Sequence, residues 1–346
     1  AFSGGFEYTA NEVITLNGTG VSGGAALNNL SDDNAFDGTV ALAANSSIGA
    51  SSGSLAFNGP ITGSFNVTKV GGGQVDLFAL NNTYLDTHVS TGTFGVWYPS
   101  GAGTGLVTVD AGAKLAGNGF VPGGVDLSGT IEPGVGVDIL DTGDQTWQEN
   151  AQYNWDISDA SGFAGMPPGW DLLNINGGLE SLATASDPFT IHIRSLEPSF
   201  ETPGDAANFN NALDYAWPIA ATTGGVDVDL SGFVVDDSNF SNEKGFGFFM
   251  VDTANSGNDL VVRFVHPPYI TLQPTNTSGQ CSSGTASFSV GAAGTGILSY
   301  QWLSNGIPLV DDAHFSGVST PTLTITTPVP ADAPGNYSCA IAGDFG

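Results

Sequence analysis

Short runs of alternating apolar and polar residues, each stopped by glycine, dominate this chain. Residues 53–59, 65–68 and 106–115 show the pattern most clearly. A period of two bounded by turn residues is typical of β-strands with one face on a core. Only residues 203–214 have a helical composition, and that helix would be short. The sequence therefore predicts an all-β fold.

The composition supports a packed protein rather than a disordered one. The 346 residues are 40% hydrophobic, but only 11% are charged, against about 25% in an average soluble protein. This length exceeds what one compact domain usually holds. More than one β-rich region is expected.

The charge balance excludes two classes of partner. The net charge is −29, and there are five basic residues, Lys69, Lys114, Arg194, Lys244 and Arg263. Such a surface repels nucleic-acid phosphates and anionic lipids. No apolar run approaches the roughly 20 residues that span a bilayer, so no membrane insertion of this segment is expected. The N-terminus lacks a signal-peptide pattern, so a signal peptide has been removed or the chain is a piece of a longer one.

Two similar segments suggest an internal repeat. Residues 23–39 and 72–87 each run from a glycine pair through a strand to an asparagine-rich turn. Asn34 and Asn82 lie 48 residues apart, which predicts two stacked coils of about 24 residues each.

An ordered set of four motifs points to a known family. The set comprises residues 68–73 (TKVGGG), 82–84 (NTY), 107–119 (VTVDAGAKLAGNG) and 129–134 (GTIEPG). It resembles the autotransporter-associated β-strand repeat of bacterial surface proteins, over roughly residues 20–135. The chain departs from that pattern at Leu85 and Asp86, where the family has a small residue and glycine. The resemblance implies a right-handed parallel β-helix that acts through its shape and surface.

Three regions are expected along the chain. Residues 1–135 would form the β-solenoid, and residues 136–265 its β-rich continuation or cap, with a separate jelly-roll sandwich as the alternative. Residues 266–268 (HPP) would form a stiff linker. Residues 266–346 resemble an immunoglobulin-like domain, because Trp302, Tyr337 and Cys339 have the offsets of its buried tryptophan, tyrosine corner and second cysteine.

The cysteines depart from the usual immunoglobulin pattern. The usual position of the first cysteine falls at Val290, and Cys281 lies earlier. A displaced Cys281–Cys339 disulfide is still expected in a secreted chain, and two free thiols are the alternative. The last strand of such a domain is missing before Gly346. Either the protein continues, or another chain supplies a strand by β-augmentation.

No catalytic, cofactor-binding or metal-binding residue is predicted. The pairs Asp156 with Asp171 and Asp227 with Asp229 could serve a glycosidase, but they belong to no catalytic motif. Five basic residues are too few for a polysaccharide lyase, and the four histidines lack zinc spacing. Residues 32–38 resemble a calcium loop without its ligand spacing, so a solvated turn is favoured over a Ca²⁺ site.

The aromatic residues of the first two regions allow two interpretations. They would fill the core or form a carbohydrate-stacking strip, and core is favoured. The set is Trp97, Tyr98, Trp147, Tyr153, Trp155, Trp170, Tyr215 and Trp217.

The sequence favours a structural, non-enzymatic protein that is secreted or displayed at the cell surface. It would be a stalk, or a subunit of a bacterial filament or sheath that binds copies of itself through chain ends or β-strand edges. An adhesin for surface glycans or proteins is the alternative, and a carbohydrate-active enzyme is the third hypothesis.

Overall fold

The computed structural model describes residues 1–21, 24–199, 202–275, 284–332 and 335–345, and these residues confirm an all-β fold. They contain no α-helix, only short 3₁₀ turns such as η2 (Leu230–Gly232) and η3 (Asn255–Gly257). The chain divides into two compact units. The first comprises Ala1–Asn210, Ala216–Glu243 and Phe249–Arg263, and the second Asn211–Tyr215, Lys244–Phe248 and Phe264–Gly346.

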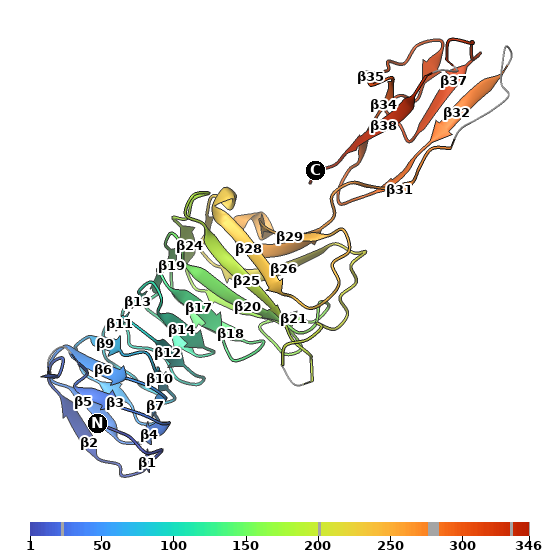
Figure 1. The fold of residues 1–346 in the computed structure, drawn as a ribbon. Coiled ribbons are helices and arrows are strands. Elements are labelled where there is room, and N and C mark those ends of the chain that lie inside the picture. Colours follow the sequence, from blue (N-terminus) through green and yellow to red (C-terminus); the bar gives the residue numbers. More distant parts are fainter. Residues whose placement is uncertain (22–23, 200–201, 276–283, 333–334, 346) are drawn as a thin grey trace. The chain divides into compact units, whose positions relative to one another are not determined.

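Mostly parallel sheets build the first unit (Figure 1, blue to yellow). A 12-stranded sheet has the order β1 (Glu7–Tyr8), β4 (Asn34–Phe36), β7 (Ser54–Phe57), β10 (Gln74–Leu77), β12 (Thr93–Val96), β14 (Lys114–Gly117), β17 (Thr130–Pro133), β20 (Gln152–Ile157), β22 (Gly169–Trp170), β21 (Phe163–Ala164), with β25 (Phe189–Ser195) beside β20 and β28 (Phe233–Asn239) beside β25. A nine-stranded sheet has the order β27 (Gly225–Asp227), β24 (Gly178–Ser181), β19 (Gln145–Trp147), β16 (Val125–Leu127), β13 (Val107–Val109), β11 (Thr87–Val89), β9 (Val67–Val70), β6 (Ser46–Ala50), β3 (Leu27–Asn29).

Two smaller sheets accompany them. One joins β15 (Phe120–Val121), β18 (Ile139–Thr142), β23 (Leu172–Ile175), β26 (Tyr215–Thr222), β30 (Asp259–Val265) and β29 (Phe248–Ala254). The other joins β2 (Val13–Leu16), β5 (Thr39–Leu42) and β8 (Ile61–Thr62). From β1 to β20, successive strands of one sheet are separated in the chain by strands of the others, as expected for a chain that passes repeatedly through each sheet.

The register shows that the repeat is shorter than predicted. In the 12-stranded sheet Leu55 pairs with Val75, Val75 with Phe94, and Phe94 with Leu115, which are steps of 20, 19 and 21 residues. The expected 24-residue coil was therefore wrong. Its anchor residues are not equivalent, because Asn34 lies within β4 whereas Asn82 lies in a loop and binds Ile61 at the start of β8.

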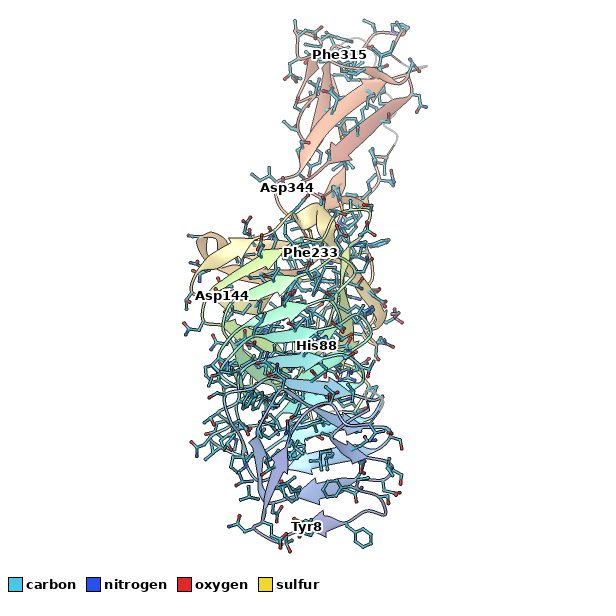
Figure 2. The ribbon with its side chains drawn as sticks, turned by 90° about the vertical axis from the view of Figure 1, so that its left-hand side faces the viewer. Tyr8, His88, Asp144, Phe233, Phe315 and Asp344 are labelled. Carbon is cyan, nitrogen blue, oxygen red and sulfur yellow. The ribbon has the colours of Figure 1, made fainter. Side chains whose placement is uncertain are left out.

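The core of the first unit is a stack of like residues. Along the 12-stranded sheet Leu55, Val75, Phe94, Leu115 and Ile131 follow one another in register, and each is almost fully buried. Alternation places their neighbours on the outer face. Burial of these apolar columns contributes most of the driving force for stacking. Figure 2 shows the strands of the first unit with their side chains, and the labelled His88 lies on β11 of the nine-stranded sheet.

Lys69 explains the TKVGGG motif. The side chain is fully buried, and Nζ donates to the carbonyl oxygens of Gly71, Gly73 and Thr91 at 2.5–2.7 Å. Burial lowers the pKa of Lys69 to about 8, opposed by the charge of Asp76, so the ammonium still has three N–H groups at neutral pH. The cation thereby joins two successive turns. Gly92 leaves room for it, since a Cβ at residue 92 would collide with Nζ.

A ladder of Asn and Asp side chains joins successive repeats on another side. Asn45 Oδ1 accepts from Asn66 N, Asn66 Oδ1 accepts from Asp86 N, and Asp86 Oδ1 accepts from Leu106 N. Asp86, the residue that departs from the family pattern, is thus one step of this ladder. Each bond satisfies a backbone N–H that the strands leave unpaired.

The NTY motif is a buried polar joint. Asn82 accepts from Ile61 N and donates to Ala79 O, Ser100 Oγ and Gly101 O, so it contacts three successive repeats. Tyr84 is also buried, and its hydroxyl accepts a hydrogen bond from Thr87.

The same sheets continue past residue 135. Strands β18, β19 and β20 pair in parallel with β23, β24 and β25. The short helix expected at residues 203–214 was wrong, because this segment binds a neighbouring one instead. Ala207 N donates to Ser158 O, Ala160 N donates to Ala207 O, and Asn208 has a positive φ of 56°.

The second unit contains antiparallel sheets (Figure 1, orange to red). Their strand orders are β31 (Tyr269–Leu272), β33 (Gly291–Ala293); β32 (Thr285–Ser289), β37 (Thr322–Thr326), β36 (Phe315–Ser316); and β35 (Ile307–Pro308), β34 (Ser299–Ser304), β38 (Tyr337–Ala342). The two three-stranded sheets share a core of Val290, Trp302, Val318, Leu323 and Ile325.

The predicted linker at residues 266–268 begins with an anchored residue. His266 is buried, and its ring nitrogens lie 2.8 Å from Asp214 Oδ1 and 2.7 Å from Asn211 O. His266 is therefore held within the second unit, which the prediction of a stiff linker at residues 266–268 did not foresee.

We predict that Lys69→Met lowers the free energy of unfolding by about 2–4 kcal/mol, because three partly buried turn carbonyls lose their shared donor. Urea denaturation followed by circular dichroism measures the change. Lys114→Met is the matched control and should cost no more than about 1 kcal/mol, since Lys114 is about one-third exposed and Glu132 keeps two other partners. Equal losses in the two variants would contradict this role of Lys69.

Candidate functional site

A hollow of about 310 Å³ lies on the outer face of the 12-stranded sheet. Its lining combines polar, charged and aromatic side chains from five strands, β10, β12, β14, β17 and β25, and the segments that follow them. The lining residues are Gln74, Thr93, Trp97, Lys114, Ala116, Glu132, Gly134, Val135, Arg194, Leu196 and Pro203. We call this hollow the sheet groove.

Strand alternation delivers these side chains to the same face. Leu115 and Ile131 face the core, so Lys114, Ala116 and Glu132 face outward. Two of the five basic residues of the chain, Lys114 and Arg194, thus line one groove.

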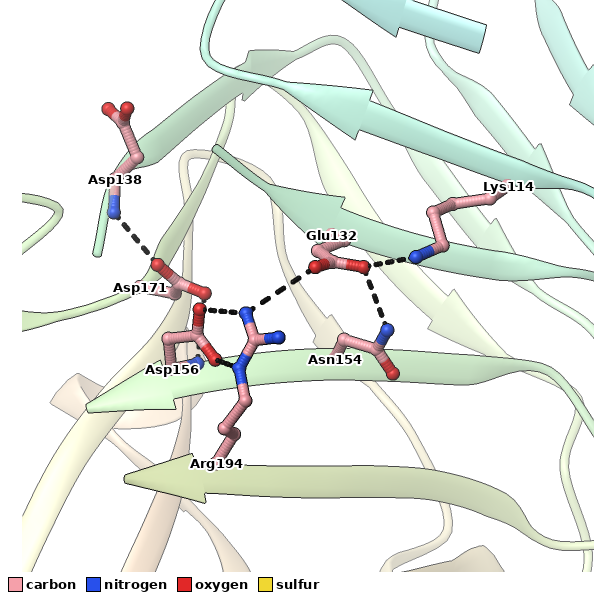
Figure 3. Close-up of polar contacts among 7 residues, drawn as sticks. All are labelled: Lys114, Glu132, Asp138, Asn154, Asp156, Asp171 and Arg194. Carbon is pink, nitrogen blue, oxygen red and sulfur yellow. Dashed lines mark hydrogen bonds and ion pairs between the residues drawn. The ribbon is translucent and has the colours of Figure 1, made fainter. Parts of the chain in front are cut away.

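An ion-pair network crosses four strands at the groove (Figure 3). Glu132 receives hydrogen bonds from Lys114 Nζ and from Asn154 Nδ2, and its Oε1 lies 3.5 Å from Arg194 Nη2. Arg194 also donates from Nε and Nη2 to the two carboxylate oxygens of Asp156. This bidentate contact is the strongest geometry for an arginine–carboxylate pair.

A second carboxylate lies behind Asp156. Asp171 is fully buried, and its oxygens accept from the backbone N–H groups of Asp156 and Asp138 at 2.9 and 2.8 Å. Burial, and then the charge of Asp156, raise the pKa of Asp171 well above its usual range. The sequence pair Asp156 and Asp171 is therefore brought together, but below the surface instead of across an open cleft.

The pKa values of the other two acids of the network, Asp156 and Glu132, shift in opposite directions. Burial raises the pKa of Asp156, although the hydrogen bonds and charge of Arg194 oppose that rise. Burial also opposes ionisation of Glu132, but hydrogen bonds from Lys114 and Asn154 with the nearby cations outweigh it and lower its pKa. Glu132 is thus held as a carboxylate at neutral pH.

Trp97 forms the aromatic wall of the groove. Its Nε1 donates to Asp76 Oδ1 at 2.6 Å, and its ring stacks on Phe78 with centroids 6.4 Å apart. The indole crosses the outer face of Gly95, because a Cβ at residue 95 would lie 2.5 Å from Nε1. Gln74 also donates to Asp76, which holds the acceptor in place.

A smaller hollow of about 240 Å³ adjoins the sheet groove through the shared residue Arg194. Its lining residues are Asn154, His192, Ile193, Arg194 and Asn239. His192 Nδ1 lies 2.9 Å from Asp236 Oδ2.

The residues singled out from sequence lie elsewhere. Trp302 is fully buried in β34 and donates to Thr320 O. Tyr337 begins β38 and stacks on Phe288, and Cys339 is half-buried opposite Trp302. Val290 lies in the core beside Trp302, where the sequence placed it. Cys281 lies outside the described residues, so the Cys281–Cys339 disulfide stays a prediction.

The remaining candidates are dispersed. Asp227 ends β27, and Asp229 caps the 3₁₀ turn η2 through Ser231 N. In the loop at residues 32–38, Asp32 accepts from Gly4 N and Ser31, and Asn34 is buried against Asn29. Among the described residues no group of three or more His, Cys, Asp or Glu residues could hold a metal ion.

The aromatic residues divide between core and surface. Trp147, Tyr153, Trp155 and Trp217 are buried, as favoured from the sequence. Tyr98 is 78% exposed, so the expected core position was wrong for it, and Trp170 and Tyr215 are half-buried. Trp97 is also only half-buried and lines the groove. Sequence reasoning placed it with the core residues. The available signal was its position two residues after Gly95 of β12, because continued alternation past the end of the strand at Val96 would put both residues on the outer face.

Comparisons with known proteins add little. No protein-family model matches the chain, and no curated protein matches it. Among solved structures, Drosophila OTK, extracellular domains 3-5, has a TM-score of 0.23 and 20% sequence identity, and the match covers 38% of this chain and 47% of that one. A TM-score this low carries no argument. Within the described residues, no helix is long and apolar enough to cross a membrane.

We predict that Arg194→Met destabilises the protein in a pH-dependent way. At pH 8 the loss should be about 2–3 kcal/mol, below the usual cost of breaking a buried pair because Arg194 is 39% exposed. Without Arg194 the pKa of Asp156 rises further above its unfolded value. The folded variant then holds a proton that the unfolded chain has released, so its stability recovers as the pH falls.

Urea denaturation at pH 8 and pH 5 measures this effect. Arg263→Met, which removes an ion pair with Asp252 whose side chains are 35% and 31% exposed, is the control and should lose no more than about 1 kcal/mol at either pH. A loss for Arg194→Met that is the same at both pH values would contradict the assignment of Asp156 as the affected group.

Proposed function

We propose that this protein is a structural, non-enzymatic part of a secreted or cell-surface protein. In this proposal a parallel β-solenoid forms the first unit and an immunoglobulin-like domain forms most of the second. The observation that carries it is the direction of the polar side-chain bonds. Lys69, Asn82 and the ladder from Asn45 to Leu106 all join one repeat to the next, so the polar residues of these repeats reinforce the stack.

The dimensions of the sheets support a spacer role. Nine stacked strands at the usual separation of about 4.8 Å extend over about 38 Å. Each repeat contacts mainly its neighbours, as in other repeat proteins, and such stacks serve as extended platforms.

The immunoglobulin-like assignment is supported by the second unit's core. Two antiparallel sheets enclose the buried Trp302, and β34 pairs with β38, which carries Tyr337 and Cys339. These are the relations expected for strands C and F of such a domain.

The non-enzymatic proposal is supported by the state of the groove carboxylates. Glu132 and Asp156 both contact Arg194, and Asp171 is occupied by two backbone N–H groups. A glycosidase needs an acid and a base that face a substrate across a cleft. Here Glu132 and Asp156 are paired with the cation of Arg194, and Asp171 accepts hydrogen bonds from backbone amides, so none of them faces an open cleft as a free acid or base.

We predict a Cys281–Cys339 disulfide in the secreted protein. Mass spectrometry of a non-reduced digest should find the two peptides linked, and reduction should lower the free energy of unfolding by about 4 kcal/mol on the chain-entropy model. Two peptides alkylated without prior reduction would show free thiols and contradict the bridge.

Electron microscopy of the purified protein tests the structural role. If copies assemble through chain ends or strand edges, negative stain should show regular filaments with a repeat near one subunit length. Dispersed particles at high concentration would contradict the homopolymer. Depolymerisation of a polysaccharide by the protein, absent from an Arg194→Lys variant, would contradict the non-enzymatic role itself.

A further inference from the structure

We propose that the sheet groove binds a neutral oligosaccharide, with Trp97 as its stacking platform. This inference concerns a ligand and is independent of the structural role proposed above. It rests on the size of the groove, its charge balance and the donors that remain free.

The groove has the dimensions of a site for an extended ligand. Small-molecule sites generally span about 300–1,000 Å³, and the sheet groove falls at the lower end with about 310 Å³. The adjoining hollow shares Arg194. From β10 to β25 the strands extend over about 24 Å at their usual spacing. A linear oligomer lying across the strands fits this shape better than a compact molecule.

The charge balance favours an uncharged ligand. Lys114 is paired with Glu132, and Arg194 with Asp156, so the cations that face the groove are already neutralised. The chain as a whole carries a net charge of −29 and repels anions. Glu132 Oε2 already accepts two hydrogen bonds, and Oε1 lies 3.5 Å from Arg194 Nη2, which leaves little for a cation.

Free hydrogen-bonding groups remain along the groove. Arg194 donates from Nε and Nη2. Its Nη1 makes no contact with the other residues drawn in Figure 3. Lys114 uses Nζ for a single carboxylate. Gln74 and Thr93 line the same hollow with an amide and a hydroxyl. A ligand rich in hydroxyl groups can both accept from the cations and donate to the amide.

Trp97 provides an apolar surface in the groove, against which a ligand can stack. Its hydrogen bond to Asp76 and its position across Gly95 hold the indole against the sheet, where it lines the hollow. An aromatic wall beside fixed polar groups selects a ligand with one apolar face and a polar rim. A pyranose ring has both, since its C–H bonds form an apolar face and its hydroxyl groups form the rim.

Isothermal titration calorimetry at pH 7 with defined hexasaccharides tests this proposal. The probes are the β-1,4-linked hexamers of glucose, mannose, galactose, xylose and N-acetylglucosamine, with hexagalacturonate as the anionic comparison. At least one neutral hexamer should bind, and more tightly than the anionic one. Absence of binding by every neutral probe at millimolar concentration, or binding of hexagalacturonate alone, would overturn the proposal.

Three variants locate the site. Trp97→Ala should weaken binding of the neutral hexamer at least tenfold. Gly95→Ala keeps every lining side chain but displaces the indole, because its Cβ meets both Trp97 and Asp76, and should weaken binding similarly. Phe163→Ala removes a 72% exposed aromatic ring outside the groove and should leave binding unchanged. Circular dichroism verifies that each variant is folded. Unchanged binding in folded Trp97→Ala would overturn the assignment of the site.

Discussion

Every turn of a parallel stack leaves backbone carbonyl and amide groups beside those of the next turn, and the fold depends on satisfying them. Strand pairing cannot do so, because the chain changes direction there. The Lys69 ammonium donates hydrogen bonds to three carbonyl oxygens from two successive turns. In the Asn and Asp ladder, one side-chain oxygen of each repeat accepts a hydrogen bond from a backbone amide of the next repeat. The stack is thus joined by polar bonds at its corners as well as by its apolar core.

The scarcity of basic residues makes each position informative. A buried ammonium is costly unless it is fully bonded, and Lys69 meets that condition. Lys114 and Arg194 have a different role, because they form ion pairs with the half-buried Glu132 and the buried Asp156 on the outer face. With 34 acidic residues and only five basic ones in the chain, most carboxylates have no lysine or arginine partner.

The sequence predicted the class of fold well and its periodicity poorly. Alternation of apolar residues shows strands because it reflects a local property of the backbone. The repeat length depends on register between strands, and the paired asparagines suggested a spacing that the register does not follow. The helix expected at residues 203–214 failed for a related reason, because Ala207 binds the backbone of Ser158 and Ala160 instead of its own neighbours. Asp171 shows the same limit, since it accepts from the backbone amides of Asp156 in β20 and of Asp138 just before β18.

The sheet groove follows from the way a stack builds its surface. In a parallel stack each repeat adds one residue to every outward column, so a column keeps its direction across the strands. Asp76, Gly95, Ala116 and Glu132 follow one another in register in one such column. Its two central members have almost no side chain, so the surface dips between the acids, and Trp97 folds across Gly95 into this space. The sequence of a single strand shows only a glycine or an alanine on its outer face. The groove forms because these small residues align in neighbouring repeats, which leaves space where polar groups and an indole lie together.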